Sequence, residues 1–412
     1  MAALKTRHRL AVLITHPIQY FRPVFAELAK DPCLEVLVLF GCDHGLRLSL
    51  DPDFGVPIAW DSAPTDGFPH VLLSDCSLAD LSHWRTAVPL AVRLSWRLRA
   101  FRPDAVLVFA YTPAFITAST LLLWLQGQRL LLRADGTDRA FQRSHLKSLF
   151  KDLLLRGWYR QFAHVFPIGS DSDAHFRRLG VPDRRRTPVR YAVDVDYFAE
   201  QVQHWAPQRA PLRQEESIPS DALVLLWSAK MTRVKNPELL LESLALLPGE
   251  IRQRFWLLAV GDGPMRNAFA VGAEQQLPGR CRFVGFRNQS ELGRFYAMAD
   301  VLVFPSQQGE TWGLVVNEAL QFGLAVIASD HVGSGRDLVE PPAQTPMGSA
   351  LFASNNPQAL ARALVAFSEA CPEGFVPQPL AELPRPRDLA EAVGVVVHQL
   401  VPLSGSARHP AP

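Results

Sequence analysis

Two glutamates separated by seven residues are the strongest chemical signal in this chain. Glu310 follows a short apolar run that ends at Pro305, and Glu318 lies within the next apolar segment, GLVVNEAL. An ionised carboxylate accepts hydrogen bonds from two neighbouring hydroxyl groups, such as those of a ribose or pyranose ring. Backbone N–H groups at the start of the helix that carries Glu318 can also hold an anion. The pattern therefore predicts a site for a polar, hydroxyl-rich ligand.

A hydrolytic site is one alternative for the same two carboxyl groups. In glycoside hydrolases the two groups stand about 5–10 Å apart across the bond that is cleaved. Eight residues along one helix would separate Glu310 from Glu318 by roughly 12 Å, unless the turn before the helix changes the distance. A hydrolase is therefore the weaker interpretation.

Lysine is rare in the chain, which contains 6 Lys and 36 Arg. Two of these lysines, Lys230 and Lys235, lie in one short loop of the second half, which favours a functional role over an ordinary solvated charge. The segment Gly261-Asp262-Gly263 follows an apolar run but lacks the G-x-G-x-x-G spacing, so a dinucleotide site there is only weakly indicated.

Three residues of the first half also follow apolar runs and are candidates for contact with a substrate. His16 comes after the first run, where it could contact a donor or an acceptor or could cap a helix. Tyr111 follows the run AVLVF. Asp135 follows LLLRA, where it could bind a polar group of a substrate or serve as a helix N-cap.

These residues stand at the ends of short apolar runs that alternate with helical patterns, as in β-α units around a parallel sheet. A length of 412 residues suits two domains. We expect two doubly wound α/β domains that face each other across a cleft, with ligands at the carboxyl ends of the strands. The predicted domains are residues 1–205 and 221–375, with a linker at 204–220 and a Pro-rich tail at 376–412 that contains a helix at 388–401. The predicted strands are Leu10–Thr15, Glu35–Phe40, Ala105–Phe109, Leu130–Arg133, His164–Ile168, Leu223–Trp227, Phe255–Val260, Cys281–Val284, Val301–Phe304 and Ala325–Ala328.

Composition narrows the classes of function. A net charge of +2 argues against a dedicated nucleic-acid binder, and a hydrophobic content of 48% argues against disorder. Five cysteines without a CxxC pair argue against a disulfide framework or a Cys-based zinc site. Asp-x-Asp triplets begin at Asp51, Asp171 and Asp194, none of them beside the glutamate pair, and they predict turns and caps rather than a metal site. The first apolar run, Leu10–Ile14, is too short for a signal-peptide core, so we expect a cytoplasmic protein.

The glutamate pair resembles the E-x7-E signature of retaining glycosyltransferases of family 4, which have the GT-B fold. Other segments match the family in the expected order, and together they span most of the chain. The resemblance implies two Rossmann-like domains and transfer of a sugar from a nucleotide-sugar donor to a glycan, lipid-linked or small-molecule acceptor. The matching segments are ITHPIQYFRPVFAELA near the start, LDPDFGVPIAWD at 50–61, SAKMTRVKNPELLLESLALL at 228–247, LLAVGDGPMRNA at 257–268 and RFVGFRNQSELGRFYAMADVLVFPS at 282–306.

The resemblance also implies roles for individual residues. Glu310 would bind hydroxyl groups of the donor sugar, Glu318 would accept hydrogen bonds from the ribose, and Lys230 and Lys235 would neutralise the diphosphate. Two cations and a helix N-terminus would stabilise the leaving diphosphate without a metal, so we expect a hexosyltransferase that needs no cofactor. The other residues on the donor side would be Gly313 and Leu314 through their backbone N–H groups, Phe286 and Arg287 beside the base, and Gly261.

The chain departs from the family at one place. Many relatives carry a histidine near the donor sugar, whereas this stretch reads Phe109-Ala110-Tyr111-Thr112-Pro113, so the sequence identifies no general base. Two alternatives therefore stay open. One is a nucleotide-sugar epimerase of the same fold, and the other is a non-catalytic binder of nucleotide-sugars.

Two helical patterns of the first half are strongly basic. Arg85–Arg102 carries five arginines and no acid, and Ser144–Gln161 combines an apolar face with basic residues. An ordinary surface helix is one interpretation. The more specific interpretation is that these helices dock on an anionic membrane to reach a lipid-linked acceptor. Docking would bring the protein to the inner face of the membrane.

Overall fold

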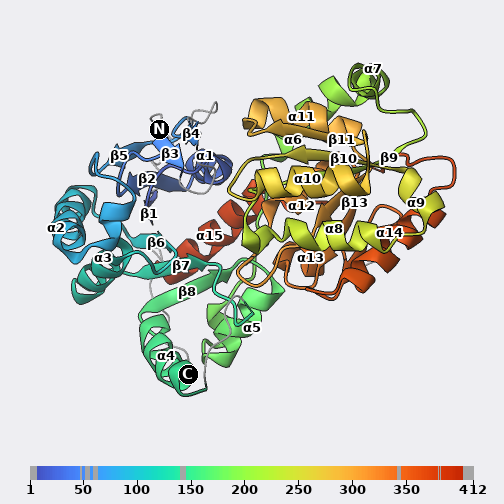
Figure 1. Cartoon of the computed structure of the whole chain (residues 1–412). Coiled ribbons are helices and arrows are strands. Elements are labelled where there is room, and N and C mark those ends of the chain that lie inside the picture. Colours follow the sequence, from blue (N-terminus) through green and yellow to red (C-terminus); the bar gives the residue numbers. More distant parts are fainter. Residues whose placement is uncertain are drawn as a thin grey trace, which may run out of the picture.

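The structure is a computed structural model that describes residues 7–46, 49–51, 56–58, 64–139, 145–340, 345–378, 380 and 382–401, with backbone alone at 49–51, 56–58 and 145–148. Two six-stranded parallel sheets form the framework, one in each half of the chain (Figure 1). Most of the segment 50–61 that carries part of the family resemblance lies outside the described residues.

The first sheet has the order β5-β2-β1-β6-β7-β8, and the second has the order β11-β10-β9-β12-β13-β14. Numbered along the chain within each sheet, both orders are 3-2-1-4-5-6, the order of a classical dinucleotide-binding fold. The first sheet contains β1 (His8–Ile14), β2 (Leu34–Phe40), β5 (His70–Leu72), β6 (Ala105–Phe109), β7 (Leu130–Ala134) and β8 (Phe162–Pro167). The second contains β9 (Leu223–Ser228), β10 (Phe255–Val260), β11 (Cys281–Gly285), β12 (Val301–Phe304), β13 (Ala325–Ser329) and β14 (Ala350–Phe352), while β3 (Ser49–Asp51) and β4 (Val56–Ile58) form a separate antiparallel pair.

Helices cover both faces of each sheet, which is why the strands are almost continuously apolar. On the first sheet, α2 (Trp84–Phe101), α3 (Ala114–Leu125), α4 (His145–Tyr159) and α5 (Ser170–Arg178) pack on one face, and α1 (Arg22–Lys30) and α15 (Pro386–Leu400) pack on the other. On the second sheet, α8 (Pro237–Ala245), α10 (Arg266–Gln276) and α14 (Pro357–Ala370) cover one face. The other face is covered by α6 (Val195–Trp205), α7 (Arg209–Glu215), α11 (Gln289–Met298), α12 (Leu314–Gln321) and α13 (Gly333–Leu338).

All ten predicted strands are present, each within two residues of its expected ends. The sequence does not predict β5 and β14, because three residues are too few for an alternating or apolar pattern to stand out. The predicted GT-B class, with two Rossmann-like domains, is confirmed by the two sheets and their strand order.

The segment 204–220, where we predicted the linker between the domains, is mostly helical. The short 3-10 helix Ala206–Gln208 and α7 continue directly from α6. Arg213 on α7 is buried and donates to the carboxylate of Asp300 at 2.6 Å, and Arg209 pairs with the same carboxylate. These tertiary contacts stabilise the helix in a segment that has no clear helical period in its sequence.

The packing crosses the predicted domain limits at two places. Figure 1 shows α15, in red, lying against the first half of the molecule, where it packs on α1 and β1. In the opposite sense, α6 packs on α11 and α12 of the second half. The predicted final helix is present as α15, and the limits 1–205, 221–375 and 376–412 stay predictions. Among the described residues, no helix is both long and apolar enough to cross a bilayer.

Candidate active site

The two glutamates of the E-x7-E pattern lie on different kinds of structure. Glu310 is in the loop that leaves β12, and α12 begins only at Leu314. Gly313 is the N-cap of α12 with a φ of 89°, and a Cβ at this position would lie 2.7 Å from the ring of Phe304. Because Gly313 separates the loop from the helix, the 12 Å spacing expected for two glutamates on one helix does not apply.

Glu310 is paired directly with Lys235. The Lys235 ammonium group contacts the carboxylate and also lies 4.8 Å from the centroid of the Phe304 ring. The hydroxyl of Ser306 donates to the same carboxylate oxygen at 3.3 Å. Lys235 follows β9 and Glu310 follows β12. These adjacent parallel strands mark the point where the strand order of the second sheet reverses, and such folds bind their ligands at this point.

Lys230 and Gly261 belong to two loops that pack against each other at the same edge of the sheet. The backbone N–H of Met231 donates to the carbonyl of Asp262 at 2.8 Å. Gly261 has a φ of 125°, and a Cβ there would lie 2.1 Å from the Ala229 carbonyl oxygen. The glycine therefore permits the close approach that positions the loop of Lys230.

Glu318 is 3% exposed and accepts a hydrogen bond at each of its carboxylate oxygens. The Tyr20 hydroxyl donates at 3.0 Å and the Tyr296 hydroxyl donates at 2.5 Å. Burial raises the pKa of Glu318 above its usual value, with the two tyrosine hydroxyls acting in the opposite direction. Tyr20 lies in the 3-10 helix Gln19–Phe21 after β1, so this contact joins the two halves of the molecule.

The loop that carries Glu310 is held against the first half of the chain by Trp312. Its indole N–H donates to Asn317 at 2.9 Å, and the Asn317 amide donates to the Tyr191 carbonyl at 3.0 Å. A Cβ at Gly169 would lie 2.4 Å from the Trp312 ring, so only glycine allows this approach. The tryptophan therefore fixes the loop of Glu310 relative to the first sheet.

Asp135 is brought to the same loop from the first half. Its carboxylate accepts a hydrogen bond at 3.2 Å from the hydroxyl of Thr311, the residue next to Glu310. The structure thus places this candidate for substrate contact beside the loop that carries Glu310.

His16 and Tyr111 occupy the loops after β1 and β6. His16 shares a hydrogen bond of 2.9 Å with Thr15, and its ring lies edge-to-face with His44 at 5.2 Å. Burial, together with His44, lowers the pKa of His16 to about 4, which keeps the ring neutral near pH 7. The Tyr111 ring packs against Tyr159, with ring centroids 6.5 Å apart.

Phe286 and Arg287 lie in the loop after β11, as expected. The Arg287 guanidinium pairs with Glu291 at 3.2 Å. Leu314 lines a small hollow beside Tyr20. Sequence reasoning did not single out Tyr20, Tyr296, Thr311 or Trp312. Tyr20 lies within the matching segment ITHPIQYFRPVFAELA and Tyr296 within the matching segment at 282–306, and these two segments were the signals that could have pointed to them.

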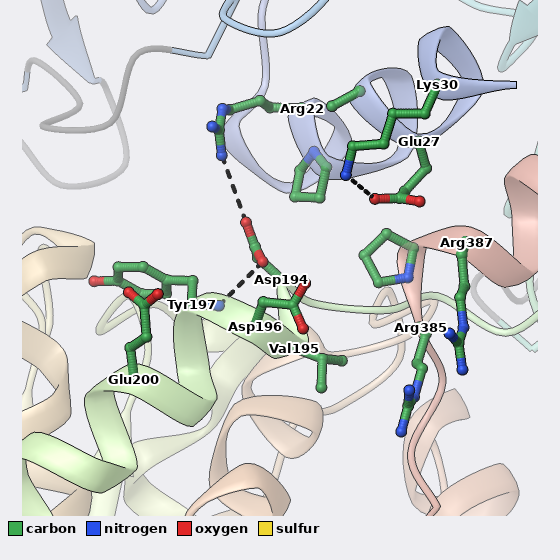
Figure 2. Close-up of a pocket in the computed structure, with 13 residues that line it drawn as sticks. Arg22, Glu27, Lys30, Asp194, Val195, Asp196, Tyr197, Glu200, Arg385 and Arg387 are labelled. Atoms are coloured by element: carbon green, nitrogen blue, oxygen red, sulfur yellow. Dashed lines mark hydrogen bonds and ion pairs between the residues drawn. The ribbon is translucent and has the colours of Figure 1, made fainter.

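A second pocket, of about 490 Å³, lies where α1, α6 and α15 meet, and Figure 2 shows the residues that line it. It contains none of the predicted site residues. Much of its charge is paired internally, since Arg22 contacts Asp194 at 3.5 Å and Lys30 contacts Glu27 at 2.6 Å. We therefore place the candidate active site at the glutamate pair and not here.

Comparison with known proteins gives a family match within the second half of the chain. Residues 208–370 match the family model described as glycosyl transferases group 1. Over these residues the chain is similar to that family. The group 1 segment contains Lys230, Lys235, Glu310 and Glu318.

Curated relatives match about a third of the chain. A D-inositol 3-phosphate glycosyltransferase of Xylanimonas cellulosilytica is 31% identical over 36% of this chain and 35% of its own length. A lipopolysaccharide 1,2-N-acetylglucosaminetransferase of Salmonella typhimurium is 32% identical over 30% of this chain and 34% of its own. The chain thus spans about a third of the length of these relatives.

Solved structures resemble almost the whole chain at low sequence identity, and so they show the fold alone. A glycosyltransferase from Rickettsia africae superposes with a TM-score of 0.66 at 13% identity, covering 97% of this chain and all of that one. A UDP-GlcNAc 2-epimerase from Neisseria meningitidis bound to UDP-GlcNAc superposes with a TM-score of 0.60 at 14% identity, covering 95% of this chain and 99% of that one. Transferases and an epimerase therefore share this GT-B architecture.

Proposed function

We propose that this protein is a retaining, hexosyltransferase-type glycosyltransferase that moves a sugar from a nucleotide-sugar donor to a glycan, lipid-linked or small-molecule acceptor. The observation that carries the proposal is the Lys235–Glu310 pair at the carboxyl ends of β9 and β12, next to the N-terminus of α12. The group 1 match over residues 208–370, which include this pair, supports the same conclusion.

The pair accounts for the chemistry of the donor. The lysine ammonium exchanges the Glu310 carboxylate for the donor diphosphate, and Lys230 supplies a second cation from the same loop. Glu310, released from Lys235, accepts hydrogen bonds from hydroxyl groups of the sugar. As the anomeric bond breaks, negative charge grows on the diphosphate, and fixed cations with the first N–H groups of α12 stabilise it.

Retention follows from attack on the face that the leaving group occupies. In this scheme the leaving phosphate accepts the proton of the acceptor hydroxyl, so no protein nucleophile takes part. Asp135 orients the acceptor, because its contact with Thr311 places it beside Glu310. Two lysines and a helix N-terminus supply the required positive charge, and we propose that transfer is independent of a metal.

An epimerase and a non-catalytic binder are the competing functions, and one experiment separates them. The protein is incubated with a panel of nucleotide-sugars and a cell-envelope extract, and products are followed by mass. Release of the nucleotide with a larger glycosylated product supports transfer. Conversion of the donor sugar without release of the nucleotide would identify an epimerase. Binding of a nucleotide-sugar without any turnover would identify a non-catalytic binder.

The assignment of Glu310 is tested in the same assay. Glu310→Gln should lower turnover by at least about 100-fold and change nucleotide affinity less than threefold, because the carboxylate acts on the sugar. Glu242→Gln is the matched control, since Glu242 is an exposed glutamate on α8. Full turnover by Glu310→Gln would remove Glu310 from the mechanism.

We further propose that the first half docks on an anionic membrane, where it meets a lipid-linked acceptor. Four apolar side chains of α4, namely Leu149, Phe150, Leu153 and Leu154, are 67, 67, 68 and 58% exposed. On α2, Trp84, Val88, Val92 and Trp96 form an exposed stripe at intervals of four residues, flanked by the exposed arginines Arg85, Arg93, Arg97 and Arg99. Exposed apolar residues beside arginines fit the interface of a membrane with anionic lipids.

Co-sedimentation with vesicles tests this surface. The wild-type protein should bind vesicles that contain phosphatidylglycerol and should dissociate at high salt. Phe150→Ser with Leu153→Ser should weaken binding at least fivefold. Val271→Ser is the control, because Val271 is 61% exposed on α10 of the second half. Equal binding by the double variant and the control would exclude α4 as the contact.

A further inference from the structure

Three segments that are distant in the sequence meet at the edge of the first sheet opposite the candidate active site. Asp31 follows the last residue of α1, Cys33 immediately precedes β2, and His398 lies in the last turn of α15. His8, the first residue of β1, lies beside them. In a parallel sheet the amino ends of the strands are the edge away from the ligand cleft, so these side chains take no part in the proposed sugar transfer.

The three side chains already form a compact set of metal ligands. A carboxylate oxygen of Asp31, the Sγ of Cys33 and a ring nitrogen of His398 all lie within 4.8 Å of one another. Tetrahedral zinc, with bonds of about 2.0–2.3 Å, needs neighbouring ligand atoms roughly 3.3–3.8 Å apart. Side-chain rotations that bring the ligand atoms about one ångström closer together would therefore close the site without moving the backbone.

The surrounding chain holds these ligands in place. One oxygen of the Asp31 carboxylate accepts the backbone N–H of Cys33 at 2.8 Å, and the Cys33 carbonyl accepts the N–H of His8 at 2.9 Å. The second Asp31 oxygen lies against α15 at Gly394, where a Cβ would be only 2.9 Å away. A glycine one turn before His398 thus makes room for the carboxylate on the surface of the helix.

The ligands also have few competing partners within the described part of the chain. Asp31 has no ion pair there with lysine or arginine, and Cys33 is a free cysteine. The His398 ring lies edge-to-face against that of His8, with centroids 4.8 Å apart, and His8 is 3% exposed. This buried neighbour restricts the orientation of the His398 ring.

We propose that Asp31, Cys33 and His398 bind one zinc ion, with water as the fourth ligand, and that the ion ties α15 to the first domain. Sulfur and imidazole ligands select zinc over magnesium and calcium, which prefer oxygen alone. Binding converts the Cys33 thiol to a thiolate with release of a proton, so the affinity falls as the pH is lowered.

The test uses the full chain, stripped with a chelator and titrated with Zn²⁺ or with Co²⁺ as a spectroscopic probe. We expect one ion per chain, a higher melting temperature with Zn²⁺, and the charge-transfer absorption of a thiolate bound to Co²⁺. Cys33→Ser should abolish that absorption, and both Cys33→Ser and His398→Gln should weaken Zn²⁺ binding at least tenfold. Cys281→Ser, which changes another partly buried cysteine in the second half, should leave all three readouts unchanged.

A second measurement needs no variant. Alkylation of the native protein, mapped by mass spectrometry, should be slowed at least tenfold at Cys33 by Zn²⁺ and be unchanged at Cys76, which is also a partly buried free cysteine. Equal alkylation of Cys33 with and without Zn²⁺, or Co²⁺ binding without thiolate absorption, would overturn the proposal.

Discussion

The Tyr20 hydroxyl donates a hydrogen bond of 3.0 Å to Glu318, a residue 298 positions later in the chain. Tyr20 belongs to the first half of the molecule and Glu318 to the group 1 segment. The Tyr296 hydroxyl occupies the other carboxylate oxygen. Each oxygen of the carboxylate that the family resemblance assigns to the ribose thus already accepts one hydrogen bond, and we expect a nucleotide that uses this carboxylate to compete with the Tyr20 hydroxyl.

Removal of the Tyr20 hydroxyl should therefore strengthen nucleotide binding. Tyr20→Phe should tighten nucleotide binding roughly threefold to tenfold, since a hydrogen bond worth about 0.5–1.5 kcal/mol no longer competes. The same change should lower the melting temperature, because a buried carboxylate oxygen loses its partner. Calorimetric titration measures the first effect and thermal unfolding the second.

Tyr197→Phe is the control for that variant, since the Tyr197 hydroxyl donates to the backbone carbonyl of Gln289 at 2.9 Å. Nucleotide affinity that is unchanged or weaker in Tyr20→Phe would show that Tyr20 and the nucleotide do not compete.

The buried state of Glu318 should make stability depend on pH in a defined direction. Its pKa in the folded protein is raised above the value of 4.5 of the unfolded chain. As the pH rises from 4.5 to the folded pKa, the unfolded chain releases its proton first, and the folded protein loses stability. Glu318→Gln does not titrate, so the free energy of unfolding of wild type minus variant should fall across this window and then level off. Urea unfolding from pH 4 to pH 8 measures the difference, and a constant difference would contradict the prediction.

Lys235 and Glu310 should behave as a coupled pair in stability as well as in activity. Each single change, Lys235→Met or Glu310→Gln, leaves one largely buried charge without its partner. The double variant should be more stable than the sum of the two single effects predicts, by roughly 1 kcal/mol. A double-mutant cycle of urea unfolding measures this coupling, and additive effects would show that the contact contributes nothing to stability.

Gly261→Ala should disturb the loop that positions Lys230. The new Cβ would lie 2.1 Å from the Ala229 carbonyl at a φ of 125°, and both the clash and the positive φ oppose it. We expect a loss of at least about 2 kcal/mol in the free energy of unfolding, with weaker nucleotide binding. Gly249→Ala is the matched control, because a Cβ there meets nothing within 4 Å and should change stability by less than about 1 kcal/mol. Equal effects of the two changes would remove the steric explanation.

Much of the fold could be read from the sequence because its strands are buried on both faces. A run such as AVLVF, at 105–109, is apolar at every position, and it forms β6 over the residues expected. The loops after β9 and β12 could be located in the same way, and with them Lys235 and Glu310. Local signals also predicted the final helix, which the structure shows as α15.

Contacts between distant segments were decided only by tertiary packing. No pattern in the sequence predicts the contact between Tyr20 and Glu318. The same is true of the contacts with Asp300 that stabilise the helix at 206–215, and of the proximity of His398 to Asp31 and Cys33. The absence of a CxxC pair argued against a Cys-based zinc site, because that motif detects only ligands that are close in the sequence. Periodicity and turn signals act over a few residues, whereas these contacts depend on how two complete sheets and the returning α15 pack together. The sequence by itself therefore determined ten of the twelve strands of the two sheets, the fold class and the loops of Lys235 and Glu310, and the tertiary structure alone decided which side chains meet across them.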